Sequence, residues 1–135
     1  MEQKLTYEKF RKYFVIVLSV FTGLLHIGQF TFCPMESIKF YSWHLTLGLM
    51  FVFLYKPLSK KNPKKYLWAD WLCILLTVVS GAYVILNYDT YVVIMQTGKL
   101  TTGLYVFGLI VTLLVIEATR RCLGWILPII SLITV

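Results

Sequence analysis

Four long apolar segments limit the folds open to this chain more than any other feature of its sequence. The first covers residues 13–33, and as a helix its 21 residues would be about 31 Å long, which matches the hydrocarbon thickness of a bilayer. Three more follow at about residues 38–55, 66–88 and 100–116. The first segment is longer than a signal-peptide core, and no small-residue cleavage motif follows it. The sequence therefore predicts an all-α integral membrane protein with four transmembrane helices.

Composition and charge agree with a membrane protein. Of the 135 residues, 59% are apolar and 14% are charged, whereas soluble domains have about 45–50% and about 25% respectively. The formal net charge of +7 does not indicate nucleic-acid binding, because the basic residues occur in blocks between the apolar segments. Blocks of this kind are typical of the loops that orient a protein in a membrane.

The basic blocks also predict which side of the membrane each end occupies. The N-terminal region and the loop between the second and third segments are much more basic than the other two connections. By the positive-inside rule we expect the N-terminus and the 56–65 loop in the cytoplasm, and four crossings place Arg120 and Arg121 on the same side. The basic residues on that side are Lys4, Lys9, Arg11, Lys12, Lys56, Lys60, Lys61, Lys64 and Lys65, against Lys39 and Lys99 on the other.

Two further apolar stretches are too short to cross a bilayer. Between the third and fourth segments, the seven residues TYVVIMQ predict a short helix lying in the outer interface. After the fourth segment, residues 122–135 are 14 residues long and are expected to begin a fifth helix, or a connector to a large transport domain. The expected organisation is therefore a four-helix membrane domain at residues 1–121, followed at residues 122–135 by the start of a further helix or the connector.

The four tryptophans lie near the ends of the predicted spans. Aromatic residues of this kind collect at the two membrane–water interfaces, where their rings are partly apolar and partly polar. We therefore expect them to anchor the bundle in the bilayer. They are Trp43, Trp68, Trp71 and Trp125.

The acidic residues of the spans lie close to the predicted cytoplasmic ends. Asp70 is about one turn inside the third span, where a structural salt bridge to Lys64, Lys65 or the Arg120–Arg121 pair is favoured over a proton or ion site. Glu117 and Arg121 are four residues apart and can pair along one helical face. A charge at the membrane centre costs about 2.5–3.5 kcal/mol. We therefore expect Glu117, Arg120 and Arg121 at the interface, as a junction to the next domain.

Two histidines are expected at similar depth on adjacent helices. His26 and His44 could ligate a haem b or a metal there, although hydrogen bonds to neighbouring carbonyls or hydroxyls are favoured. Cys33, Cys73 and Cys122 have no metal-ligand spacing and are expected to be packing residues.

The chain has no motif for catalysis. It contains no phosphate-binding loop, catalytic triad or Cys/His metal cluster, so we expect no enzyme and no catalytic, cofactor or metal site. The predicted spans also have no charged residue near their middle and no interruption by Gly and Pro at mid-membrane. The usual signature of a substrate or ion site in a secondary transporter is therefore absent.

The last two segments resemble a known family. The run EATRR at residues 117–121, followed by Gly124–Trp125 and Pro128, is similar to fused permeases of tripartite ATP-independent periplasmic (TRAP) transporters, in the branch served by TAXI-type binding proteins. Other similar features are His44, the basic loop after the second span, Trp68-Asp70-Trp71 and the triplet Gln96-Thr97-Gly98. The chain resembles the N-terminal, small (Q-type) membrane domain of such a permease.

This resemblance implies a scaffold in a sodium-coupled, elevator-type transporter for organic acids in a bacterial inner membrane. The implied partners are a large (M-type) transport domain that holds the sodium site, a periplasmic substrate-binding protein and membrane lipid. Three alternatives stay open on sequence alone: a bis-histidine haem or other redox membrane protein, a self-contained small transporter or channel, and an assembly factor.

Overall fold

Helices account for almost all of the structure, a computed structural model that describes residues 2–32, 34–59 and 66–134. Within these residues there is no strand, and four helices are long and apolar enough to cross a membrane. The protein is therefore an all-helical, multi-pass membrane protein. The helices are α1 (Glu2–Thr31), α2 (Ser37–Tyr55), α3 (Leu67–Leu86), α4 (Tyr88–Thr97), α5 (Thr102–Leu123) and α6 (Ile126–Thr134).

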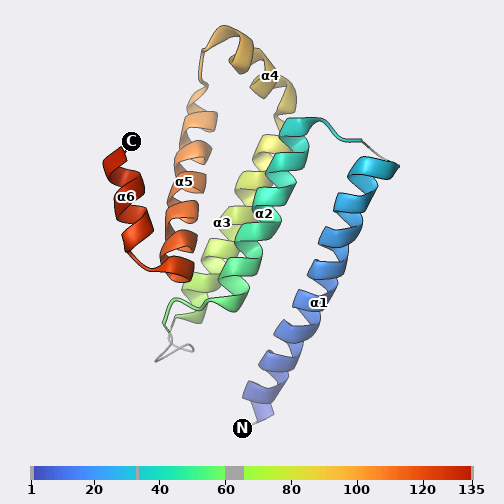
Figure 1. Ribbon diagram of the computed structural model, residues 1–135, viewed down its shortest axis with the longest axis vertical. Coiled ribbons are helices and arrows are strands. Elements are labelled where there is room, and N and C mark those ends of the chain that lie inside the picture. Colours follow the sequence, from blue (N-terminus) through green and yellow to red (C-terminus); the bar gives the residue numbers. More distant parts are fainter. Residues whose placement is uncertain (1, 33, 60–65, 135) are drawn as a thin grey trace.

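The four long helices run alternately up and down (Figure 1). Helices α2 and α3 pack most closely, α5 packs against both of them, and α1 packs on α2. The short α4 connects α3 to α5 at one end of the bundle, which we call the α4 end. The N-terminal end of α1, the C-terminal end of α2, the start of α3 and the α5–α6 turn lie at the opposite end, which we call the Arg121 end.

Two glycines with positive φ set the ends of α4 and α5. Gly98 has φ +70° and its N–H donates to the Ile94 carbonyl at 2.7 Å, which ends α4 in a left-handed conformation that glycine adopts without strain. Gly124 has φ +82° and ends α5, with its N–H bonded to the Arg120 carbonyl at 3.0 Å. The chain can therefore turn sharply, and α6 folds back along α5.

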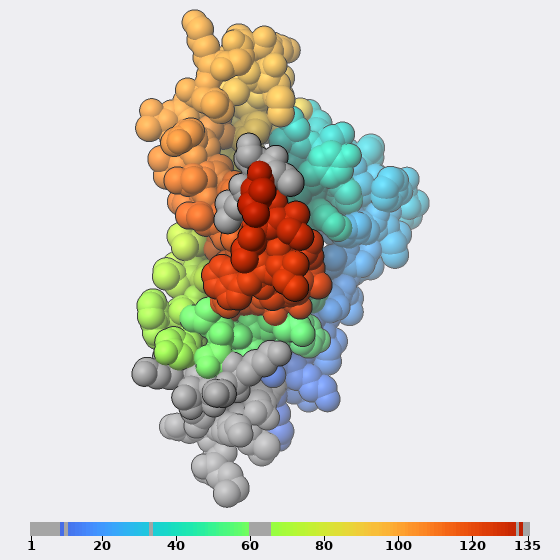
Figure 2. Space-filling view, turned by 60° about the vertical axis from the view of Figure 1, so that its left-hand side comes forward, coloured from blue at the N-terminus to red at the C-terminus, as the bar shows by residue number. Residues whose placement is uncertain are grey.

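Helix α6 lies on the outside of the bundle and contacts α5 (Figure 2). Its nine residues are about 14 Å long, roughly half a membrane thickness. Pro128 faces inward and is fully buried, whereas Ile126 and Ile133 are largely exposed. This short apolar helix needs lipid or another protein against its outer side.

The buried core lies nearer the Arg121 end. Its residues come from the later turns of α2 and α5 and from the first half of α3, with one contribution from α1. Most large side chains of α1 point outward, and Phe30 is 85% exposed. Lipid-facing side chains of this kind are expected in a bundle whose solvent is hydrocarbon. The core residues are Val15, Leu49, Phe53, Leu54, Ile74, Leu114 and Ala118.

The helix boundaries differ from the sequence expectation at two places. Helix α1 begins at Glu2, so the polar stretch before residue 13 continues the first span as helix. Helix α5 continues through EATRR to Leu123, so the boundary placed after Arg121 falls within its last turn. The predictions for Cys33, Lys60, Lys61, Lys64 and Lys65 lie outside the described residues.

Candidate functional site

A cluster of charged side chains closes the Arg121 end of the bundle. We call Asp70, Glu117, Arg120 and Arg121 the Arg121 cluster. The Arg121 side chain is 2% exposed, and its Nη1 lies 2.5 Å from Asp70 Oδ1 and donates to the Lys56 carbonyl at 3.0 Å. Its Nε donates to Glu117 Oε1 at 2.8 Å. One guanidinium from α5 therefore holds α3 and the C-terminal end of α2 together.

Asp70 is nearly as buried as its partner, with 8% of its side chain exposed. Its Oδ1 also accepts a hydrogen bond from the Leu58 N–H at 3.2 Å, which ties the chain after α2 to the start of α3. The carboxylate lies in the first turn of α3, where the positive end of the helix dipole favours a negative charge. Of the cations considered from the sequence, Arg121 is the one paired with Asp70, and Lys64 and Lys65 lie outside the described residues.

The outer half of the cluster is more open. Arg120 donates to both carboxylate oxygens of Glu117, at 2.7 and 2.8 Å, and these side chains are 23% and 27% exposed. The Arg120 guanidinium also lies 5.3 Å from the ring centroid of Trp125, within cation–π range. Arg121 stacks in the same way over Phe53, at 4.9 Å.

This geometry makes the cluster a structural clamp. Asp70 Oδ1 already accepts from a guanidinium and from a backbone N–H. A buried carboxylate that is already paired with a guanidinium is a poor acceptor for a transported ion or proton. The sequence predicts Glu117, Arg120 and Arg121 as a junction at the membrane surface, and in the structure the Arg121 side chain is buried against Asp70.

His26 and His44 meet across the α1–α2 contact near the α4 end. His26 Nε2 and His44 Nδ1 are 2.9 Å apart, and His26 Nδ1 lies 2.7 Å from the Thr22 carbonyl. The rings pack edge to face with centroids 5.1 Å apart, and Phe40 packs against His26. The sequence considered bonds to carbonyls and hydroxyls or ligation of a metal, and it did not anticipate a direct bond between the two rings.

The histidine geometry does not support haem binding. Two imidazoles on opposite sides of an iron would have their ligating nitrogens about 4 Å apart, because metal–nitrogen bonds are about 2 Å long. Here the facing nitrogens are 2.9 Å apart and bonded to each other. Within the described residues, no group of three or more His, Cys, Asp or Glu side chains could hold a metal ion.

The hydrogen bonds fix the tautomers of both histidines. A carbonyl accepts only, so His26 must carry its proton on Nδ1, and its Nε2 then accepts the proton of His44 Nδ1. We expect the neutral form of each ring to have its proton on Nδ1. Long-range ¹H–¹⁵N spectra of the ¹⁵N-histidine-labelled protein measure this directly. An unprotonated Nδ1 on His26 would contradict the arrangement.

A second polar cluster lies at the α4 end. Lys39 Nζ is 3.0 Å from Glu36 Oε2 and 4.2 Å from the centroid of the Tyr88 ring. The bond from Lys39 lowers the pKa of Glu36, whereas partial burial and the hydrogen bond to Glu36 raise the pKa of Tyr88. All three groups are near water, so this cluster joins the start of α2 to α4 only weakly.

The tryptophans lie toward both ends of the bundle. Trp68 and Trp71 are in the first turns of α3 and are 68% and 42% exposed, and Trp125 follows α5 at the same end with 62% exposed. Trp43 lies in the second turn of α2, toward the α4 end, and packs edge to face on Phe21 with centroids 6.4 Å apart. These positions suit the interface anchors that the sequence indicates.

Comparison with known proteins gives no relative for this arrangement. The sequence matches no family model and no curated protein, and the fold matches no solved structure. Function must therefore be argued from the geometry and the residues alone.

Proposed function

We propose that this chain is the small scaffold domain of a TRAP-type secondary transporter, of the TAXI branch, in a bacterial inner membrane. It carries no catalytic, cofactor or metal site of its own. Sodium and an organic acid bind in a large, M-type transport domain, and a periplasmic binding protein delivers the substrate. The four-helix bundle braces the static part of that transporter while the transport domain moves.

The position of the charged side chains carries this proposal. In α2, α3 and α5, every Asp, Glu, Lys and Arg lies within seven residues of a helix end. Secondary transporters hold substrate and coupling ions near the midplane, with ionisable side chains or broken helices. The buried charged side chains of this bundle pair with one another and hold its helices together. This arrangement supports a bracing role better than a transport role.

The outward-facing surface supports the same role. Helix α1 exposes Val17, Leu24 and Phe30 at 67%, 63% and 85%, and α6 exposes Ile133 at 78%. Such surfaces need lipid or the helices of a larger membrane domain against them. The resemblance of the EATRR run and of the Gly124–Trp125 turn to TRAP permeases favours a transport domain as one of these partners.

The charge distribution supports an orientation for the bundle. The N-terminal basic residues Lys9, Arg11 and Lys12 precede or open the first span and lie at the Arg121 end with Lys56. By the positive-inside rule, the Arg121 end then faces the cytoplasm and α4 lies at the periplasmic interface. The short length of α4 suits a helix lying along that surface.

Reconstitution tests the proposal against a self-contained transporter. We expect the purified chain alone to give no sodium-driven uptake of radiolabelled mono- or dicarboxylates into liposomes. Sodium-dependent uptake is expected when the same chain is reconstituted with the multi-span permease that co-purifies with it, together with the binding protein. Omitting the chain should abolish uptake or prevent isolation of an intact permease.

Two results would overturn the scaffold role. Uptake or ion conductance by the chain alone would make it a transporter in its own right. Full uptake by the permease after the chain has been removed would make it at most an assembly factor.

A further inference from the structure

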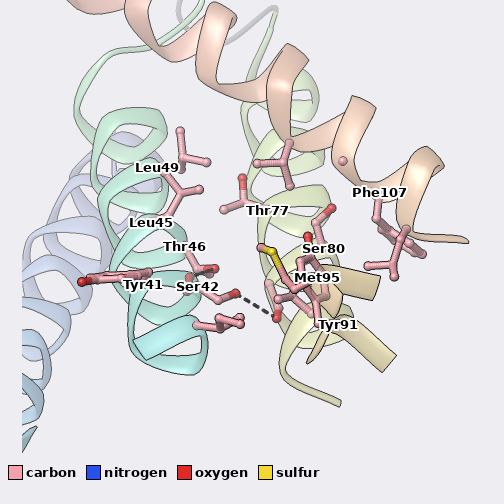
Figure 3. A pocket seen from close by; sticks show the side chains of 16 residues that line it. Tyr41, Ser42, Leu45, Thr46, Leu49, Thr77, Ser80, Tyr91, Met95 and Phe107 are labelled. Atoms are coloured by element: carbon pink, nitrogen blue, oxygen red, sulfur yellow. Dashed lines mark hydrogen bonds between the residues drawn. The ribbon is translucent and has the colours of Figure 1, made fainter. Parts of the chain in front are cut away.

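A pocket opens between the helices where they separate toward the α4 end. Its volume is about 300 Å³, at the lower end of the range for small-molecule sites. It is lined by α2, α3 and α5, and Tyr91 and Met95 of α4 close one end (Figure 3). Along α5 it extends from Leu104 to Val111, about 10 Å by helix rise. The helices are tied together at the Arg121 end, so the space lies in the other half of the bundle.

The lining is apolar apart from a small group of hydroxyls. The side chains of Ser42, Thr46, Thr77 and Ser80 lie between α2, α3 and α5 (Figure 3). None of the described residues that line the pocket is charged. An ion or an organic acid would therefore find no partner for its charge, and the lining fits a neutral, mainly apolar molecule.

Ser80 differs from the other hydroxyls. Thr46 and Thr77 donate to the carbonyls of Ser42 and Cys73, one turn back at 2.7 Å, and Ser42 donates to the Gly81 carbonyl at 3.4 Å. Ser80 is 1% exposed, and its Oγ is the one buried side-chain oxygen or nitrogen in the described part of the chain without a hydrogen-bond partner. A buried hydroxyl left unpaired is costly and requires an explanation, and a bound ligand that accepts its hydrogen bond is one such explanation.

We propose that this pocket binds a neutral lipid-soluble molecule whose carbonyl oxygen accepts a hydrogen bond from Ser80. Its apolar body lies against α5 and extends past the open side of the pocket into the bilayer. Two sources share this chemistry: the acyl ester of a membrane lipid and the ring carbonyl of a prenylated quinone. Ser80 lies about 9 Å from the end of α3 by helix rise, which is within the depth of the hydrocarbon layer. The proposal does not depend on the scaffold role.

Photolabelling of the full chain in phosphatidylcholine vesicles tests the site in two arms. One arm uses a phosphatidylcholine with a diazirine on its acyl chain, and the other an azido-benzoquinone with a short alkyl tail. We expect at least one probe to label pocket residues such as Met95 and Val111, read by mass spectrometry, and the successful arm identifies the source. Ser80→Ala should weaken this labelling roughly 2- to 10-fold, the range for one hydrogen bond.

Two glycines give a matched pair of variants. Gly108 lines the pocket and a Cβ there meets nothing within 4 Å, so we expect Gly108→Leu to fill the pocket, keep the fold and remove the labelling. Gly48 also has open space around it but does not line the pocket, so Gly48→Leu should label like the wild type. If neither probe labels the pocket, or if both leucine variants label equally, the proposal is wrong.

A stability measurement separates ligand binding from a structural role of Ser80. In delipidated detergent solution without probe, Ser80→Ala should be at least as stable as the wild type, because it removes a hydroxyl that has no partner in the protein. A clearly lower unfolding temperature for Ser80→Ala under these conditions would show that the hydroxyl serves the fold, which would also overturn the proposal.

Discussion

Arg121→Met is expected to lower the free energy of unfolding by about 3–5 kcal/mol, the usual cost of removing one partner from a buried ion pair. The loss arises at Asp70, which is 8% exposed and would lose its guanidinium partner while the Leu58 N–H still donates to its Oδ1. Glu117 would still be paired with Arg120 through two hydrogen bonds. Equilibrium unfolding in mixed detergent micelles, with helicity as the signal, measures the change.

Arg120→Met is the matched control for this prediction. Arg120 is 23% exposed, and Glu117 keeps its bond to Arg121 when Arg120 is removed, so the expected loss is below about 1 kcal/mol. The double variant Asp70→Leu/Arg121→Met should recover most of the stability, because it leaves no unpaired buried charge. Equal losses for the two arginine variants, or a double variant as unstable as the sum of the singles, would contradict a buried clamp.

The sequence predicts the helices well because their signal is local. A run of about 20 apolar residues is long enough to cross a bilayer whatever it packs against, and the four long helices follow from that length alone. The short helix before residue 98 also follows from local sequence, since its apolar stretch cannot cross. The pairing of Glu117 with Arg121 needs only their spacing along one helix.

Contacts between helices were harder to predict, because they depend on how each helix is rotated about its axis. In helix α2 the polar and apolar residues are spread almost evenly around the axis, so no periodicity shows which face is buried. Several cations were therefore candidate partners for Asp70 on the sequence alone. The bond from Arg121 to the Lys56 carbonyl was not predicted. The similar depth of His26 and His44 was visible, but their direct bond needed the rotation of both helices.

The pocket could not be predicted from the sequence either, because it also depends on how the helices pack. It lies between α2, α3 and α5, so its shape depends on the angles at which these helices pack. Serine and threonine are common in membrane helices, and most of them bond their own backbone one turn back. The sequence does not distinguish Ser80 from Thr77. In the structure the Thr77 hydroxyl makes that bond and the Ser80 hydroxyl does not.

Gly81→Ala is expected to lower the free energy of unfolding by about 1–3 kcal/mol, the range for overpacking. A Cβ at this position would overlap Thr46 Oγ1 and lie 3.2 and 3.3 Å from Thr46 Cβ and Cγ2. The Thr46 side chain cannot easily turn away, because its hydroxyl donates to the Ser42 carbonyl at 2.7 Å. The steric cost should outweigh the gain of about 1 kcal/mol that alanine has over glycine in a helix.

Gly48→Ala gives the contrast that isolates this steric effect. Gly48 is also helical, but a Cβ there meets nothing within 4 Å, so the variant should be as stable as the wild type or more stable by up to about 1 kcal/mol. In the Gly81→Ala background, Thr46→Ala removes Oγ1 and Cγ2 and should restore part of the lost stability. The same micelle unfolding assay ranks the variants. If Gly81→Ala is as stable as Gly48→Ala, then α2 and α3 are not in close contact at Gly81, and the contact that supports one wall of the pocket is absent.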